Sequence, residues 1–381
     1  MRIVCCVIIF CIFHTIAIPQ SQFRFRHITT NEGLSQNSVH AVFQDKEGFL
    51  WFGTQDGLNR FDGISFKVFK HSNSDSTSIS DSYILSITED SSNNLWIGTR
   101  NGANRFNKKT ETFARYLFPE MFNFTFHQKI SEIFVDRDGN VLMILPKGLY
   151  SFSPRDNFST PTLLQAFTTG LTGIQIVQDG QNNFWMTTLN GVYCFNNKRE
   201  EHFYPFSRQL KMGGLLALRG SDLWISSASQ LMTFSVVSRT FDQFALANKK
   251  ENNLQTFLID SHNRIWVATE ENIILLTEIS PGNFQHTFIH YNEKDKFSLN
   301  DVNARCIIED NSGLFCIGTM HGGVNVYDPL QSQFKTIDES MMKTLPTVWA
   351  VCEDARKIFW FGTSNGLVKA IRKDTSRVVT T

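Results

Sequence analysis

Short stretches in which apolar and polar residues alternate follow one another along most of the chain, and turn-forming residues separate them. Alternation with a period of two is the pattern of a half-buried β-strand. The first copy predicts four strands, at Val39–Phe43, Leu50–Gly53, Leu58–Phe61 and Phe66–Phe69. Turns are predicted at Asp45–Gly48 and Gln55–Gly57, because Asp bonds nearby backbone N–H groups and Gly accepts positive φ. Four antiparallel strands in succession make one blade of a β-propeller.

The same unit recurs about eight times. Each copy has an anchor residue, most often the Trp of a Leu-Trp-Phe-Gly-Thr-like strand, and the anchors follow at intervals of 39 to 50 residues, which is the period of propeller blades. The anchors are Trp51, Trp96, Leu142, Trp185, Trp224, Trp266, Cys316 and Trp360. All copies except that of Trp224 carry Asp six residues before the anchor, and most carry Gly six residues after it. We expect each Asp to cap its turn and each anchor to fill the space between neighbouring blades.

The predicted fold class is therefore all-β, a β-propeller of four-stranded antiparallel blades. Phe23–Ile28 is predicted to be a fourth strand without a blade of its own, and such a strand can close a ring without a free sheet edge. If it completes the seventh copy, residues 22–330 form a seven-bladed propeller. Residues 331–381, which open with the strand Phe334–Ile337, are then the first, incomplete blade of a second propeller, because Arg372–Thr381 shows no clear fourth strand. The alternative is one eight-bladed ring.

Residues 1–21 differ from the repeats. Arg2 precedes the apolar run Ile3–Ile18, and polar sequence begins at Gln20, which is the pattern of a secretory signal peptide. The run is short for a membrane span, which needs roughly 20 residues. We expect an exported protein with no membrane span after the signal peptide, and a retained N-terminal anchor is the alternative.

Composition narrows the set of partners. The chain has 36 basic and 36 acidic residues, so its charge gives no reason to expect nucleic acid as a partner. Its 35 Phe residues suit pleated, half-buried strands. Beyond the signal peptide the cysteines are Cys194, Cys306, Cys316 and Cys352. They show no Cys-x-x-Cys spacing, and we expect them to be buried small hydrophobic residues.

The pattern Asp-x-x-Gly-x-Leu-Trp-Phe-Gly-Thr-x-x-Gly-Leu-x-x-Phe resembles the two-component-regulator propeller repeat. Phe25–Ile28, Glu32–Val39 and Trp51–Gly63 look like the start of the periplasmic sensor half of Bacteroidetes hybrid two-component systems. In that family a signal peptide leads into two seven-bladed propellers, and an immunoglobulin-like domain, a membrane helix, a kinase, a receiver and a DNA-binding domain follow. The resemblance covers nearly the whole mature chain and favours the seven-plus-one closure.

The resemblance implies a periplasmic, ligand-sensing propeller that responds to glycan breakdown products, with an oligosaccharide as its ligand. Kinase, receiver and membrane-helix segments are absent from this sequence, so we expect a truncated sensor that performs no phosphotransfer itself. The second hypothesis is a free-standing propeller scaffold for protein–protein interaction, with a homodimer as one form. A propeller enzyme is the third. A polar pocket would indicate a sensor, a large apolar patch a scaffold, and several shifted titratable groups in one cleft an enzyme.

Ligands are expected on the face that carries the turns between second and third strands and the loops between blades. The polar residues predicted there are Gln55, Asp56, Arg100, Asn101, Lys147, Asn190 and His321. Such groups can hydrogen-bond sugar hydroxyls, and solvated turn residues are the alternative interpretation. No catalytic residue, metal site or cofactor is predicted, because Gly-x-Ser-x-Gly, Walker A and His-Glu-x-x-His patterns are absent and the repeated Asp residues lie one to a blade.

Overall fold

The computed structural model describes residues 23–118, 129–130, 132–145, 148–159, 161–166, 173–196, 200–207, 213–227, 231–244, 246, 254–330, 347–354, 356, 358–364, 366–373 and 377–380. The chain divides into two compact units. One unit is Phe23–Pro329, and the other includes Leu330–Thr381. Each unit is described by itself below.

Within the described residues, the strands form eight four-stranded sheets, all of them antiparallel. Sheet one contains β2 (Val39–Gln44), β3 (Leu50–Thr54), β4 (Gly57–Phe61) and β5 (Phe66–Phe69). Sheet two contains β6 (Ile84–Glu89), β7 (Leu95–Thr99), β8 (Gly102–Asn107) and β9 (Thr112–Tyr116). Sheet three contains β10 (Ile133–Val135), β11 (Val141–Leu145), β12 (Gly148–Phe152) and β13 (Pro161–Ala166). Sheet four contains β14 (Gly173–Gln178), β15 (Phe184–Thr188), β16 (Gly191–Phe195) and β17 (Glu201–Pro205).

Sheet five contains β18 (Gly213–Arg219), β19 (Asp222–Ser227), β20 (Leu231–Ser235) and β21 (Phe241–Phe244). Sheet six contains β22 (Leu254–Ile259), β23 (Ile265–Thr269), β24 (Ile273–Ser280) and β25 (Asn283–Ile289). Sheet seven contains β26 (Ala304–Glu309), β27 (Phe315–Thr319), β28 (Val324–Tyr327) and β1 (Phe25–Ile28). Sheet eight contains β29 (Val348–Glu353), β30 (Ile358–Thr363), β31 (Gly366–Lys373) and β32 (Arg377–Thr380). Two short 3₁₀ turns, η1 (Thr30–Glu32) and η3 (Pro154–Asp156), complete the described elements. The prediction of an all-β propeller with four-stranded antiparallel blades is confirmed.

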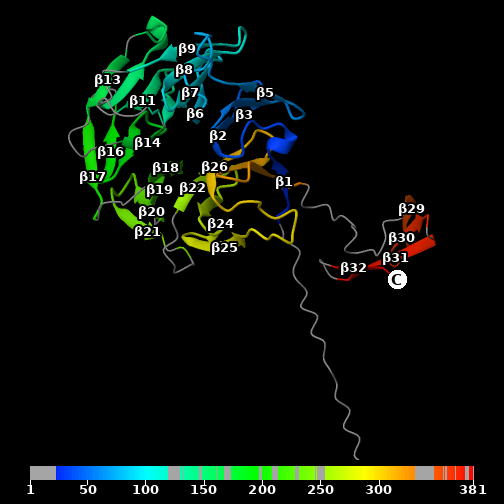
Figure 1. Cartoon of the computed structure of the whole chain (residues 1–381). Helices are drawn as coiled ribbons and strands as arrows, with labels where there is room; N and C mark the ends of the chain where they lie inside the picture. The colour runs from blue at the N-terminus through cyan, green and yellow to red at the C-terminus, as the bar shows by residue number, and fades with distance from the viewer. Residues whose placement is uncertain are drawn as a thin grey trace, which may run out of the picture. The chain divides into compact units, whose positions relative to one another are not determined.

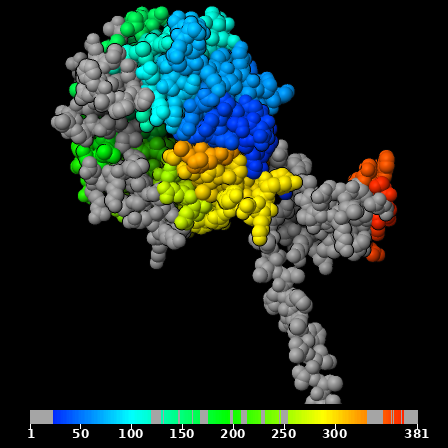
Figure 2. Space-filling view, in the orientation of Figure 1, coloured from blue at the N-terminus to red at the C-terminus, as the bar shows by residue number. Residues whose placement is uncertain are grey.

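The N-terminal strand completes sheet seven. β1 pairs antiparallel with β28, with Phe25 opposite Tyr327 and Ile28 opposite Val324. In the Phe23–Pro329 unit the colours run from blue through green to orange, and the two ends meet at β1 (Figure 1). The blue residues lie directly against the yellow and orange ones (Figure 2). β1 therefore completes sheet seven, and sheet eight has four strands of its own.

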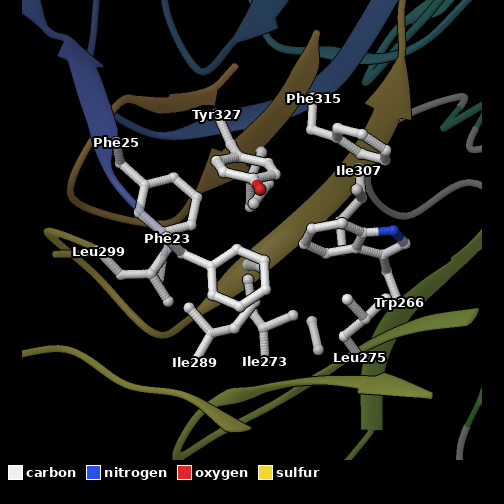
Figure 3. Packing of buried hydrophobic residues seen from close by; sticks show 13 residues of the cluster. Phe23, Phe25, Trp266, Ile273, Leu275, Ile289, Leu299, Ile307, Phe315 and Tyr327 are labelled. Atoms are coloured by element: carbon white, nitrogen blue, oxygen red, sulfur yellow. The ribbon is translucent and has the colours of Figure 1, made fainter. Parts of the chain in front are cut away.

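Aromatic packing holds this closure. Phe23 and Phe25 are 4% and 2% exposed and belong to one buried cluster with Trp266 and Tyr327 (Figure 3). The Phe23 ring meets the Trp266 ring edge-on at 6.0 Å and the Tyr327 ring at 5.1 Å. The first residues of the unit therefore connect sheet seven to sheet six by apolar burial as well as by backbone hydrogen bonds.

Among the described residues, seven clusters of buried apolar side chains fill the spaces between neighbouring sheets of this unit. Trp51 of sheet one, for example, packs with Leu95 and Ile97 of sheet two. The other anchors reach the next sheet in the same way: Trp96 sheet three, Leu142 sheet four, Trp185 sheet five, Trp224 sheet six, Trp266 sheet seven and Cys316 sheet one. Because the Cys316 cluster joins the last sheet to the first, the apolar core runs around the whole ring.

Each repeated Asp organises the turn before its anchor. Asp45 Oδ1 accepts hydrogen bonds from the backbone N–H groups of Glu47 and Phe49, both at 3.0 Å. Its Oδ2 accepts from Trp51 Nε1 at 2.8 Å. The bond from the indole recurs at Asp90, Asp179, Asp260 and Asp354. Sheet five lacks the Asp because its first two strands are joined by the short turn Gly220–Ser221, where Gly220 has φ 62°.

Sheet eight corrects one sequence expectation. Arg372–Thr381 was expected to lack a fourth strand, but β32 pairs with β31 from Lys373↔Arg377 to Ala370↔Thr380. Sheet eight therefore has its fourth strand. The β-branched residues Val378 to Thr380 suit an edge strand even in so short a segment. The predicted strand Phe334–Ile337 lies outside the described residues.

The side chains of sheet eight are much less buried than those of the other sheets. Every residue of β29 is exposed, with Trp349 at 76% and Val351 at 57%. Cys352 is likewise exposed, so its predicted burial is wrong, whereas Cys194 and Cys316 are buried and Cys306 is partly buried. The physical reason is that no second sheet packs against β29 among the described residues of this unit.

Candidate functional site

Strand register defines two faces of the Phe23–Pro329 unit. In sheet one, Val39 at the start of β2 lies opposite Thr54 at the end of β3, and Leu58 lies opposite Phe69 at the end of β5. The turns between second and third strands and the loops between blades therefore share one face, which we call the loop face. The Asp turns lie at the other ends of the strands, on the Asp-turn face.

The first strand of each sheet lines the centre of the ring. β2 contacts β6 and β26, and β18 contacts β14 and β22, so the innermost strands meet one another. Each of them has an irregular register close to its loop-face end, except β10. In β2 the shift lies between Val39 and Ala41, which leaves His40 as the unpaired residue. A bulge of this kind re-aims a side chain.

Seven polar or aromatic side chains gather around these bulges and the adjoining turns. We call them the central arc: Ser38, His40, Gln55, Tyr83, Arg100, Gln255 and Arg305. They come from sheets six, seven, one and two, or from the loops next to them, and these sheets are consecutive around the ring.

The members of the central arc contact one another across sheet boundaries. The His40 and Tyr83 rings stack at 4.9 Å with an interplanar angle of 24°. The Arg100 guanidinium lies over the Tyr83 ring, 4.5 Å from its centroid. Arg305 Nη1 donates a 3.2 Å hydrogen bond to Gln255 Oε1. The guanidinium groups of Arg100 and Arg305 are thus held by uncharged side chains, Tyr83 and Gln255.

Two long blade-connecting loops on this face have the same construction. In each, the hydroxyl of a Ser donates back to a carbonyl six residues earlier, from Ser78 to Ser72 at 3.1 Å and from Ser298 to Asn292 at 2.8 Å. An Asp three residues before that Ser accepts a backbone N–H in both loops. The loops are thus rigid supports next to the central arc rather than open chain.

A buried Asn fixes the end of each of these two loops and of the segment between β1 and β2. Asn59 and Asn104 are fully buried, and their Oδ1 atoms accept from the backbone N–H of Ser35 and Ser80 at 2.9 and 2.8 Å. Asn325 is the counterpart in sheet seven and accepts from the N–H of Asn300 at 3.0 Å. Sequence reasoning missed this bond, although the 24- or 25-residue spacing of the pairs is a signal that recurs in three copies.

The structure distributes the predicted site residues between the central arc and the outer turns. Gln55 and Arg100 belong to the central arc. Asp56 forms an exposed 2.6 Å ion pair with Lys70 of its own sheet, and the His321 side chain is 75% exposed beside Asp301. The backbone N–H groups of Asn101 and Asn190 donate to the preceding Thr hydroxyls. Lys147 lies outside the described residues.

Sequence reasoning missed the other members of the central arc. His40, Gln255 and Arg305 stand eleven residues before their anchors, and Ser38 and Tyr83 stand thirteen before theirs. A comparison of these two repeat positions across the copies would have drawn attention to them, because polar and aromatic residues interrupt an otherwise apolar strand start.

Burial and nearby cations determine the protonation of the titratable groups His40 and Glu132. Burial, together with the positive charges of Arg305 and Lys129, lowers the pKa of His40 to about 4. Desolvation raises the pKa of Glu132, just before β10, to about 8. Near neutral pH, both groups are therefore uncharged, and the cationic groups dominate the electrostatics around His40.

A separate cleft lies on the Asp-turn face between sheets five and six. Its volume is about 420 Å³, and its wall includes Arg219, Arg264 and Glu278. Arg219 pairs with Glu278, and Arg264 pairs with Asp260 at 2.7 Å. Both arginines of this cleft are thus already paired with carboxylates. Across the described part of the chain, no group of three or more His, Cys, Asp or Glu side chains could hold a metal ion.

Comparison with known proteins places these features in a family context. The model of the two component regulator propeller matches residues 33–56 and 78–101. These segments contain Ser38, His40, Gln55, Tyr83 and Arg100, so most of the central arc lies in the matched repeats. "Histidine kinase P4" of Formosa agariphila is 55% identical over 60 residues, which are 16% of this chain and 4% of that protein.

Two solved structures illustrate the range of similar propellers. The extracellular domain of a putative hybrid two component system from B. thetaiotaomicron has a TM-score of 0.69 and 22% identity, over 94% of this chain and 49% of that chain. Virginiamycin B lyase from Staphylococcus aureus has a TM-score of 0.60 and 12% identity, over 80% of this chain and 98% of that chain. Identities this low show a common fold alone, and the chain spans about half of the solved extracellular domain. The chain is a β-propeller in which residues 33–56 and 78–101 match the two-component regulator propeller repeat.

Proposed function

We propose that the Phe23–Pro329 unit is a periplasmic ligand-sensing propeller of a hybrid two-component system, and that its ligand is a product of glycan breakdown. The observation that carries the proposal is the central arc, a set of polar and aromatic side chains on rigid supports at one face of the ring. Its similarity to an extracellular domain of such a system supports the same assignment. Rings and planar polar groups are suited to sugar faces and hydroxyls.

Localisation follows from the signal-peptide pattern of residues 1–21, which lie outside the described residues. In the described part of the chain, no helix has the length and apolar character needed to cross a membrane. Export to the periplasm would place the propeller where oligosaccharides released outside the cell arrive. Fusion of residues 1–21 to a reporter enzyme that is active only after export tests this point, and a reporter retained in the cytoplasm would contradict it.

Sheet eight is, in this proposal, the first blade of a second propeller. Its exposed Val351 and Leu367 are apolar, and their counterparts Val42 and Leu58 in sheet one are buried against neighbouring blades. Glu353 precedes Asp354 just as Glu89 precedes Asp90. In sheet two that Glu bonds the preceding blade.

The test of the sensing function is thermal unfolding of the secreted chain with a panel of neutral and charged oligosaccharides. A ligand that binds only the folded state raises the unfolding temperature by mass action. We expect at least one saccharide to do so, and Gln55→Ala to weaken the effect more than Gln243→Ala on the outer strand β21. If no saccharide in the panel changes the unfolding temperature at millimolar concentration, the sensing proposal is wrong.

A scaffold for protein–protein interaction is the second candidate function, and one observation favours it. Trp349, Val351, Phe359 and Leu367 leave apolar surface exposed on sheet eight, and exposed apolar patches mark interaction sites. This hypothesis predicts a homodimer or another protein complex whose mass falls after Trp349→Ser. Light scattering across a concentration series measures that mass, and a monomer at all concentrations would argue against a homodimer.

A further inference from the structure

We propose that the central arc binds an anionic group of the ligand, a carboxylate or sulfate carried by a saccharide, between Arg100 and Arg305. This inference rests on the proposed sensing function and narrows its ligand to charged saccharides. It also places the contact at the centre of the loop face rather than on the outer turns.

The first argument is that these two guanidinium groups lack a carboxylate partner among the described residues. Arg100 is exposed and rests on the Tyr83 ring, and Arg305 is exposed and bonds the neutral Gln255. Elsewhere the arginines near acids are paired, as Arg60 is with Glu111. Arginine recognises planar or tetrahedral oxyanions through two parallel N–H bonds, so an unpaired and positioned guanidinium is suited to such a group.

The second argument is that His40 is linked to the surroundings of both arginines. It stacks on the ring that carries Arg100, and it is acted on by the charge of Arg305 and of Lys129. No carboxylate is among the charges that act on His40. An anion near His40 would therefore meet the positive charges of Arg305 and Lys129 and lose little to repulsion.

The third argument is that the arginines are held before a ligand arrives. The stack of Tyr83 on His40 fixes the ring under Arg100, and Gln255 fixes Arg305, so Tyr83 and Gln255 are positioning residues. Preorganised donors lose less side-chain entropy on binding. The cleft between sheets five and six offers no comparable site, because Arg219 and Arg264 are already paired with Glu278 and Asp260.

The test is calorimetric titration of the secreted chain with three disaccharides of similar size: neutral cellobiose, digalacturonate, and a sulfated disaccharide of the chondroitin type. We expect a charged disaccharide to bind about tenfold or more tightly than cellobiose, since one charged hydrogen bond is worth about that factor. Binding of digalacturonate alone or of the sulfated sugar alone identifies which anion the site takes. The preference should shrink at 1 M salt, where exposed charges are screened.

Variants locate the site. Arg100→Gln and Arg305→Gln should each weaken binding of the charged disaccharide about tenfold without changing the unfolding temperature, while Lys109→Gln, an exposed cation on the Asp-turn face, should leave binding unchanged. Tyr83→Phe should retain binding, and Tyr83→Ala should weaken it through loss of the ring beneath Arg100.

The outcomes separate the two proposals. Cellobiose binding as tightly as the charged sugars would overturn the anionic class and leave the sensing function standing. Charged-sugar binding that neither arginine variant changes would overturn the location. Equal stabilisation by inorganic sulfate and by the charged disaccharides would mean general anion attraction and would also overturn the inference. Failure of every saccharide would contradict the sensing function itself.

Discussion

At the scale of single residues, the repeat depends on the pairing of a turn Asp with an anchor Trp. The carboxylate joins two backbone N–H groups to the indole, so the turn and the core are fixed by one side chain. These hydrogen bonds, working against burial, lower the pKa of Asp179. The sequence spacing predicted the Asp as a turn cap, but not the bond to the indole.

Trp96 tests this pairing. Trp96→Ala should destabilise the ring by about 3–5 kcal/mol, because a large aromatic side chain that is fully buried leaves a cavity. Trp96→Phe should cost less, about 1–3 kcal/mol, since it removes chiefly the 3.0 Å bond to Asp90. Urea unfolding measures both values, and Trp349→Ala, at a 76% exposed side chain, is the control. Equal effects of Trp96→Ala and Trp349→Ala would contradict the anchor role.

Gly102 tests the turn on the loop face. Its φ is 90°, and an added Cβ would overlap the carbonyl oxygen of Tyr116 on the fourth strand. Gly63 has a similar φ of 98° but open space around it. Gly102→Ala should therefore destabilise more than Gly63→Ala, which carries only the strain of the left-handed backbone, about 1–2 kcal/mol. The difference in melting temperature measures the effect of the close approach, and equal losses would refute it.

His40 tests the electrostatics of the central arc. Its pKa is about 4 in the folded chain and near 6.5 when unfolded, so between these values the unfolded state binds the extra proton. This contribution to stability is complete above pH 6.5 and is lost as the pH falls towards 4. His40→Gln should flatten the pH dependence of the free energy of unfolding in that window. An unchanged slope, or an imidazole titrating near 6.5 by NMR, would show that the side chain is not desolvated.

At the scale of strands and sheets, polar bonds on the Asp-turn face join neighbouring blades. The last residue of a first strand accepts a backbone N–H from the preceding blade, as Gln44 does from Asn311 at 2.7 Å. Glu89, Gln178 and Glu309 do the same. The apolar clusters therefore set the spacing of the blades, and these bonds add a fixed register between them.

Lys108 strengthens one of these junctions. Its Nζ lies 2.8 Å from Asp45 of sheet one and 2.6 Å from Glu89 of sheet two, and all three side chains are under 10% exposed. Burial opposes the charged form, but the two carboxylates outweigh it and the pKa of Lys108 is raised. Lys108→Met should cost about 3–5 kcal/mol, because it leaves buried carboxylates without their cation. Calorimetric unfolding checks this, with exposed Lys109→Met as control, and a stable Lys108→Met chain would contradict the account.

Strands and turns could be predicted from the sequence where their signals lie within a few neighbouring residues. The strands of the first copy were predicted nearly to the residue, because alternation and Asp-Gly turns act within a few positions. β32 was missed, since four residues carry too little pattern to stand out. The bulge at His40 was also missed, because only pairing with β3 reveals which residue is skipped. The polar turn residues were identified as a set, whereas their separation into central and outer groups needs the ring.

At the scale of the whole propeller, stability depends on closure. β1 joins sheet seven from the opposite end of the unit, and Phe25 is buried in the cluster that spans sheets six and seven. Every blade then has a neighbour on both sides. In an open row of blades, the first and the last would each lack one neighbour.

Phe25 tests closure. Phe25→Ala should lower the free energy of unfolding by about 3–5 kcal/mol, and exchange of the β28 amides should quicken because the edge of sheet seven is loosened. Ile64→Ala, at a 92% exposed side chain, is the control and should change neither quantity. Unchanged β28 exchange in the Phe25 variant would mean that the ring does not depend on its N-terminal strand.

The central claim is that the loop face of this propeller receives a saccharide at the central arc. Hydrogen exchange of the secreted chain with and without the disaccharide that binds best tests it most directly. The account predicts slower exchange in the segments around Ser38–His40, Tyr83, Arg100 and Arg305, with no change in the turns at Asp45, Asp90 and Asp310. Protection confined to the Asp-turn face, or to the outer turns at Asn190 and His321, would contradict it.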